Sequence, residues 1–250
     1  MSVFSDGSLS NWRDSAAGKT HYPRLSENLS ADICIVGGGL TGLTTAYLLQ
    51  RAGKSVVVLD AQELARGETG RTTGHLTTVL DPKYCELEKS FGADTTALIA
   101  QSHIMASKLV GKIIEEEKID CAYYPVTGYM LATTPEQQEM LQREADAAKR
   151  AGLPGWKKLS QIDIGSFHWT SGCIQVPAQH IFHPTKYMLK LAEIVSSRGG
   201  VICTGNPVRE MHGGDHPYVV TDDGHRVEAG SIVIATHTPI NDTLTLHTKQ

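Results

Sequence analysis

The sequence predicts an α/β fold class, in which a domain with a parallel sheet and flanking helices is interrupted by a smaller mixed α+β domain. A strand, a glycine turn, a helix and a second strand open the chain, and matching strand patterns return only after residue 184. The segment between them mixes helices with short strands. We therefore expect an N-terminal arm at 1–30, a discontinuous domain at 31–118 and 184–250, and an inserted domain at 119–183.

The opening unit is defined by its apolar pattern. Ile33 to Val36 are apolar and mostly β-branched, as expected of a strand buried on both faces. Apolar residues then follow helical spacing from Leu40, and Gly53 stands where that helix would stop. Residues 55–59 form a second buried strand. This order is typical of a Rossmann-like nucleotide-binding domain.

The glycines of the turn have separate tasks. Gly37 allows a sharp turn, Gly39 lets the backbone approach a pyrophosphate, and Gly42 lets the helix pack close to the strand. Leu40 and Thr41 begin the helix, whose first N–H groups and dipole, about half a positive charge, favour an anion. The turn therefore predicts a dinucleotide pyrophosphate site.

An acid follows the second strand. Asp60, with Ala61 after it, stands where a carboxylate can accept hydrogen bonds from an adenosine ribose. A carboxylate would repel a 2′-phosphate, which disfavours NADP. With strand, helix, strand and acid in register, the cofactor interpretation is favoured over a glycine-rich turn in an unrelated α/β protein.

The remaining elements follow from start signals and apolar runs. Thr134 is suited to N-cap a helix, Pro184 opens another, and 222–225 reads as a hairpin turn. We expect helices at 83–91, 94–118, 135–151 and 184–197, and strands at 123–124, 128–132, 173–176, 201–204, 208–211, 218–221, 226–228 and 231–236.

Composition excludes several function classes. The net charge is −4 and no basic stripe stands out, so we expect no nucleic-acid partner. No apolar run has the length of a membrane span, and the polar N-terminus lacks a signal core, so we expect a cytoplasmic protein without a membrane partner. The five cysteines and eleven histidines are dispersed, which predicts neither a disulfide framework nor a metal site.

The chain resembles the D-amino-acid oxidase/glycine oxidase (DAO) superfamily of FAD-dependent oxidoreductases. The resemblance rests on 32–60, the loop 67–75, the His183-Pro184 helix entry with Asn206-Pro207-Val208, and the strand 232–236. The nearest branch has longer members with a C-terminal Rieske domain. No cysteine here is followed by histidine at Cys-x-His or Cys-x-x-His spacing, so we expect no such cluster in these 250 residues.

The resemblance implies a flavoprotein that binds FAD. A loop rich in Gly, Thr and Arg offers donors with little bulk, as an extended anionic cofactor requires, although a solvated surface loop is the plainer alternative. The loop would run along the pyrophosphate and ribityl chain toward the flavin, Val208 would meet the adenine, and a strand end would close over the cofactor. The implied cofactor residues besides the glycine turn, Asp60 and Ala61 are Arg66, Gly67, Thr69, Gly70, Arg71, Thr72, Thr73, Gly74, His75, Val208, Ala235 and Thr236.

The implied activity is hydride transfer from an amine or amino-acid-like small-molecule donor to flavin. No catalytic residue is identified, because the flavin itself carries the chemistry. His75 is the preferred polar group near the flavin, with a structural histidine as the alternative. Aromatic residues of the inserted domain are candidates to line the substrate face, with core or surface packing as the more common role and no catalytic role assigned, namely Tyr123, Tyr124, Tyr129, Phe167, His168 and Trp169.

Relatives continue beyond the point that matches Gln250, so we expect a truncated chain that is inactive alone or needs its missing part. Two other functions stay open: an NAD-dependent dehydrogenase, and a non-catalytic nucleotide-binding fragment completed by a missing segment or a partner. The partners left open are a second copy of the chain, as in a homo-oligomer, and an electron-acceptor protein.

Overall fold

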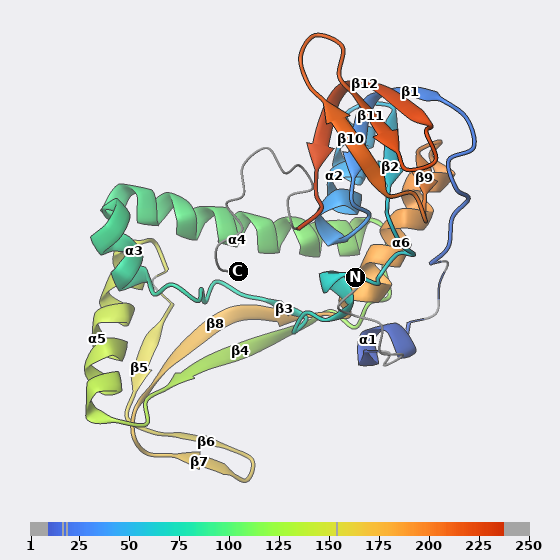
Figure 1. The fold of residues 1–250 in the computed structure, drawn as a ribbon. Helices are drawn as coiled ribbons and strands as arrows, with labels where there is room; N and C mark the ends of the chain where they lie inside the picture. Colours follow the sequence, from blue (N-terminus) through green and yellow to red (C-terminus); the bar gives the residue numbers. More distant parts are fainter. Residues whose placement is uncertain (1–9, 17, 19, 154, 238–250) are drawn as a thin grey trace. The chain divides into compact units, whose positions relative to one another are not determined.

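The computed structural model describes residues 10–237 except 17, 19 and 154, and these form two compact units (Figure 1). Unit 1 comprises the chain up to Thr73 together with the chain from His183 onward, and unit 2 comprises Gly74–Phe182. Each unit has its own sheet and its own helices.

Unit 1 is built on a six-stranded sheet in the order β10-β11-β12-β1-β2-β9. The strands β12, β1, β2 and β9 are parallel, and β10, β11 and β12 form an antiparallel meander at one edge. The strands are β1 (Leu29–Val36), β2 (Val56–Leu59), β9 (Val201–Cys203), β10 (Val208–His212), β11 (Tyr218–Thr221) and β12 (Arg226–Ile234). The predicted α/β class with a parallel sheet is confirmed.

Two helices of unit 1 pack against each other and on the sheet: α2 (Leu40–Arg51) contacts β1 and β2, and α6 (Pro184–Ser197) contacts β9. The Gln50 side-chain amide of α2 donates hydrogen bonds to the carbonyls of Val195 and Arg198 at the end of α6. A separate buried cluster that includes Cys34, Leu59 and Val227 forms a second part of the core. The sheet is therefore buried around β1 and β2, whose carboxyl ends carry the glycine turn and Asp60.

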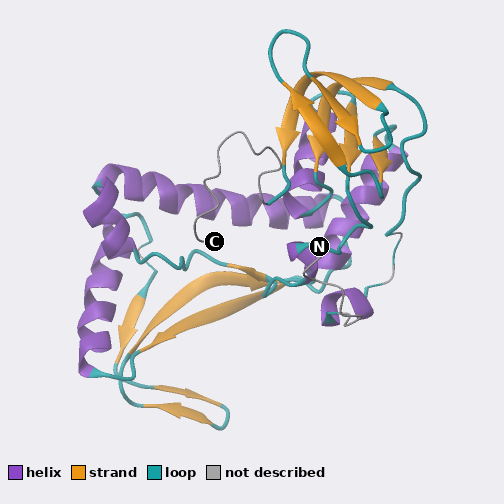
Figure 2. Ribbon diagram, in the orientation of Figure 1, coloured by secondary structure: helices purple, strands orange, loops and turns teal. Residues whose placement is uncertain are grey.

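Unit 2 contains a smaller sheet, a hairpin and three helices (Figure 2). Strand β8 lies in the middle of this sheet and pairs antiparallel with β3, β4 and β5. The elements are β3 (His75–Leu76), α3 (Tyr84–Phe91), α4 (Ala93–Glu116), β4 (Tyr124–Leu131), α5 (Pro135–Arg150), β5 (Lys157–Leu159), β8 (Cys173–Ile181) and the hairpin β6 (Ile162–Ile164) with β7 (Phe167–Trp169).

The unit boundaries differ from the expected domain boundaries. We assigned 31–118 to the first domain, whereas residues 74–118 lie in unit 2. The reason is packing: α3 and α4 contact each other and α5, and Tyr84 and Leu87 of α3 join a buried cluster with Leu141 of α5. The second boundary falls between Phe182 and His183, next to the expected position.

Several strands are longer than predicted. The segments 123–124 and 128–132 form the single strand β4, and 226–228 and 231–236 form most of the single strand β12, which ends at Ile234. Strand β8 continues to Ile181, beyond the expected end at 176. Among the described residues, no helix is both long and apolar enough to cross a membrane.

Candidate cofactor site

The glycine turn between β1 and α2 requires two of its glycines for backbone packing. Gly37 has φ +109°, and a Cβ there would overlap the carbonyl oxygen of Ala235. A Cβ at Gly42 would overlap the carbonyl oxygen of Gly37. These glycines therefore allow the turn to fold tightly between β1, α2 and the end of β12.

Gly39 is different, because the space in front of it is open. Its backbone is extended, with φ −78° and ψ −172°, and a Cβ would meet just one described atom within 4 Å, the Thr69 Oγ1 at 3.3 Å. Gly39 is the N-cap of α2, and no side-chain hydrogen bond caps it in the described structure. The N–H of Leu40 donates to Thr69 Oγ1 at 3.0 Å. A helix N-terminus with open space at its glycine cap suits a phosphate group.

Asp60 lies at the carboxyl end of β2, beside the turn. One carboxylate oxygen accepts the N–H of Gly38 at 2.7 Å and the other accepts the N–H of Gln62 at 2.8 Å. Burial raises the pKa of the Asp60 carboxyl above its usual range, while these two hydrogen bonds oppose that shift. An ionised carboxylate has about four acceptor positions, so it can still accept ribose hydroxyls. Ala61 follows it and is exposed.

The second glycine-rich loop is folded around a short 3-10 turn, Glu68–Gly70. A Cβ at Gly70 would overlap the carbonyl oxygen of Ala65, and the Arg71 guanidinium donates to the carbonyl of Arg66 at 3.2 Å. We call residues 66–73 the second glycine loop. It reaches the first turn through the Thr69 hydroxyl, so the two predicted phosphate-binding segments lie together.

The predicted residues at the end of the sheet also reach the turn. The N–H of Ala235 donates to the carbonyl of Val36 at 2.8 Å, and Thr236 follows it beside Gly37. Val208 begins β10 two residues after Asn206, whose N–H donates to the carbonyl of Asp60 at 2.9 Å. The structure therefore places these three residues on the segments that border the turn and Asp60.

Two predicted residues belong to unit 2. The carbonyl of Gly74 accepts the N–H of Phe182 at 3.0 Å, and His75 is exposed and pairs with Ile181 in β3. Their proximity to a flavin stays a prediction, as does the role of each residue assigned to the cofactor.

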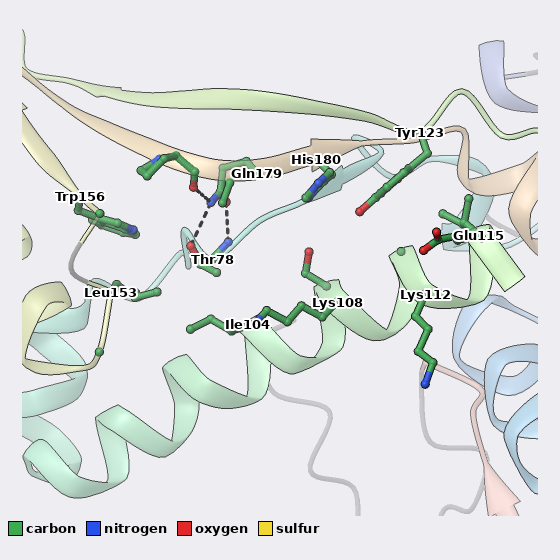
Figure 3. A pocket seen from close by; sticks show the side chains of 17 residues that line it. Thr78, Ile104, Lys108, Lys112, Glu115, Tyr123, Leu153, Trp156, Gln179 and His180 are labelled. Carbon is green, nitrogen blue, oxygen red and sulfur yellow. Dashed lines mark hydrogen bonds between the residues drawn. The ribbon is translucent and has the colours of Figure 1, made fainter.

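Unit 2 contains a mostly apolar cavity of about 760 Å³ between α4 and β8 (Figure 3). Tyr123 and His180 stack at its wall with ring centroids 4.7 Å apart, and Gln179 hydrogen-bonds to Thr78 in the same wall. Of the aromatic residues expected on the substrate face, Tyr123 lines this cavity. Phe167, His168 and Trp169 instead form β7.

Sequence reasoning did not assign the N-terminal contacts of unit 1 to this site. The Trp12 indole N–H donates to the carbonyl of Thr72, and Thr204 and Asn206 bond to the backbone of Tyr22 and Leu25. These contacts are isolated and do not recur at a regular spacing in the sequence, so no sequence pattern in 1–30 predicts them. Among the described residues, no group of three or more His, Cys, Asp or Glu is arranged to hold a metal ion.

The family model described as "FAD dependent oxidoreductase" (DAO) matches residues 32–245. The chain belongs to this DAO family. The match spans the glycine turn, Asp60, the second glycine loop and the end of β12, and it also covers unit 2. FAD is the cofactor that defines the family. The predicted resemblance is confirmed.

Two curated relatives have related sequences. A putative Rieske 2Fe-2S iron–sulfur protein, YhfW of Bacillus subtilis, is 29% identical over 88% of this chain and 43% of its own length. A gamma-glutamylputrescine oxidoreductase of Escherichia coli is 28% identical over 88% of this chain and 52% of its own length. The first name agrees with the predicted Rieske branch. The chain spans about half the length of both relatives.

The fold also resembles solved structures. Glycine oxidase from Geobacillus kaustophilus superposes with a TM-score of 0.65 and 19% identity, over 83% of this chain and 55% of that one.

The residues present fit FAD: the open helix N-terminus at Gly39 suits the pyrophosphate, and Asp60 beside it suits the ribose.

Proposed function

We propose that unit 1 binds FAD at the glycine turn, and that the whole protein oxidises an amine or amino-acid-like donor by hydride transfer to the flavin. The observation that carries the proposal is the open N-terminus of α2 at Gly39 with Asp60 beside it. The names of relatives and neighbours, gamma-glutamylputrescine oxidoreductase and glycine oxidase, support an amine-bearing donor.

In this proposal the residues bind and orient the cofactor. The helix dipole of α2 and its N–H groups after Leu40, with Thr41 among them, hold the pyrophosphate, while the Leu40 N–H bonds Thr69. Asp60 accepts the ribose hydroxyls. The backbone of Val208 faces the adenine. The second glycine loop and Ala235–Thr236 hold the rest of the cofactor. Bound FAD supplies a two-electron acceptor, and no acid or base is assigned among the side chains.

A second candidate is a nucleotide-binding portion that turns over only with a further segment or a partner. It is favoured by one finding, that the chain spans about half of its relatives. An electron-acceptor protein is the proposed partner, because one relative is named a Rieske protein.

The family match supports FAD over NAD as the cofactor. A cytoplasmic location stays a prediction.

Gly39→Val tests the site. The branched side chain would enter the open space at the helix N-terminus, and the extended backbone of Gly39 is one that valine adopts. Its Cβ would lie 3.3 Å from Thr69 Oγ1, so the Thr69 side chain must shift slightly. We expect FAD affinity, measured by quenching of flavin fluorescence, to fall by about 100-fold or more, because the pyrophosphate loses its contact with the helix.

Gly213→Val is the matched control. Gly213 lies between β10 and β11, and no described atom lies within 4 Å of a Cβ there. This variant should bind FAD like the wild type. Equal FAD affinity of the Gly39→Val variant and the wild type would refute the site.

A further inference from the structure

Helix α1 (Asn11–Asp14) connects the second glycine loop to α6. The Trp12 indole N–H donates to the carbonyl of Thr72 at 2.7 Å, and the Trp12 ring meets the His183 ring edge-on at 5.0 Å. Ser15 Oγ lies 3.0 Å from Nε2 of His183, the N-cap residue of α6. Helix α1 and its C-cap residue therefore contact both the second glycine loop and the start of α6.

A second contact reaches the same loop. The Cγ of Arg13 lies 3.3 Å from the position that a Cβ of Gly70 would take, so the aliphatic part of Arg13 covers Gly70. The same Cβ would also overlap the carbonyl oxygen of Ala65. The 3-10 turn at the centre of the loop is therefore packed closely against α1 and the preceding backbone.

The arm continues along the other end of the cofactor site. The carbonyl of Thr20 accepts the N–H of Leu64 at 2.9 Å. The Thr204 hydroxyl bonds both the N–H and the carbonyl of Tyr22, at 2.9 and 2.7 Å. Leu25 donates its N–H to the side chain of Asn206 at 2.9 Å, and the backbone N–H of Asn206 in turn bonds Asp60. The arm therefore contacts the second glycine loop directly, and it reaches Asp60 through Asn206.

We propose that this arm, the described residues between Ser10 and Leu25, positions the cofactor site, with Trp12 holding the second glycine loop in its binding conformation. The loop reaches the mouth of the site through the Thr69 hydroxyl, which accepts the Leu40 N–H. A loop ordered in advance loses less conformational entropy when a ligand binds, so affinity rises without a new contact to the ligand. Trp12 is a positioning residue. The inference rests on the proposed FAD function.

Trp12→Phe removes the indole donor and keeps an aromatic ring against His183. Trp169→Phe is the matched control, because Trp169 also donates its indole N–H to a carbonyl, that of Gly172 at 3.2 Å, but in unit 2. The first measurement is the rate of trypsin cleavage at Arg66 and Arg71 in the cofactor-free chain. We expect Trp12→Phe to be cleaved at least about threefold faster and the control at the wild-type rate.

The second measurement is FAD affinity by fluorescence quenching. Loss of one hydrogen bond that holds the loop should weaken binding about fivefold in Trp12→Phe and leave the control unchanged. Ser15→Ala, which loosens α1 from His183, should change both measurements in the same direction. If Trp12→Phe does not fold, Ser15→Ala still provides both measurements.

Each outcome decides a different claim. Faster cleavage with weaker FAD binding supports the inference. Wild-type cleavage rates in both Trp12→Phe and Ser15→Ala would overturn the inference that the arm holds the second glycine loop. Faster cleavage with unchanged FAD affinity would overturn the role of this contact in cofactor binding. A folded wild-type chain that binds no FAD would overturn the proposed function and this role together, while the cleavage rates would still decide whether α1 holds the loop.

Discussion

The His183 side chain joins two segments of unit 1, helix α1 with its C-cap residue and the start of α6. Its Nδ1 accepts the N–H of Lys186 at 3.2 Å, so the neutral ring carries its proton on Nε2 and donates it to Ser15. Trp12 packs on the ring. Burial lowers the pKa of His183 below 6.5, and the charge of Lys186 adds to this. The structure therefore requires the neutral imidazole.

This gives a pH-dependent stability. Because the folded-state pKa lies below the unfolded one, the contribution of His183 is complete above pH 6.5 and is lost as pH falls toward the folded-state pKa. His183→Asn keeps an N-cap side chain but does not titrate. We expect its urea-derived free energy of unfolding to fall less than that of the wild type between pH 7.5 and 5.5. An equal fall in both proteins would contradict this account.

The residues of the glycine motif show what a pattern can and cannot predict. The spacing of Gly37, Gly39 and Gly42 predicted the turn, and the structure shows that a Cβ at Gly37 or Gly42 would overlap backbone, while the space at Gly39 is open. The approach of Gly39 to a pyrophosphate stays a prediction. The spacing could not show that Thr69 would accept the Leu40 N–H, because the contact joins two segments that lie far apart in the sequence. Tertiary contacts of this kind have no local signal.

At the scale of elements, α3 depends on a carboxylate from another helix. Glu144 of α5 is buried, and its two oxygens accept the N–H groups of Tyr84 and Cys85 at 2.9 and 3.0 Å. Burial, followed by the Glu144 charge, raises the pKa of Tyr84 to about 12. A charged acceptor at a helix N-terminus complements the helix dipole.

Glu144→Gln should therefore destabilise unit 2. The amide offers one acceptor oxygen and turns its NH₂ toward a backbone donor, which costs about 2–3 kcal/mol of unfolding free energy. Glu139→Gln, an exposed change on the same helix, is the control and should stay within about 0.5 kcal/mol of the wild type. Urea unfolding of both variants measures this, and equal stabilities would show that the buried carboxylate is not needed.

Helices with local start signals were predicted well. Thr134 caps α5 and Pro184 opens α6, as expected. Strands that change partner or contain a β-bulge were predicted less well. The register between β4 and β8 shifts between Val126 and Gly128, and Ala178 in β8 has φ +55°. Neither irregularity follows from alternation of polar and apolar residues, so the strands were predicted too short.

At the scale of the whole molecule, the sequence indicated a discontinuous domain because strand patterns on both sides of an insertion belong to one sheet. Pairing of β1 with β12 and of β2 with β9 shows this. The first boundary was predicted too late, since an amphipathic helix such as α3 does not reveal which core it covers. The N-terminal arm was predicted, but its contacts with the cofactor segments were not, because isolated contacts leave no periodic pattern in the sequence.

The central claim is that this chain binds FAD at unit 1, and the most direct test is a titration of the purified cofactor-free chain with FAD, with NAD in parallel. The account predicts saturable quenching of flavin fluorescence at one FAD per chain, with NAD failing to compete. A chain shown to be folded by its circular dichroism that binds no FAD, or that binds NAD in preference, would contradict it.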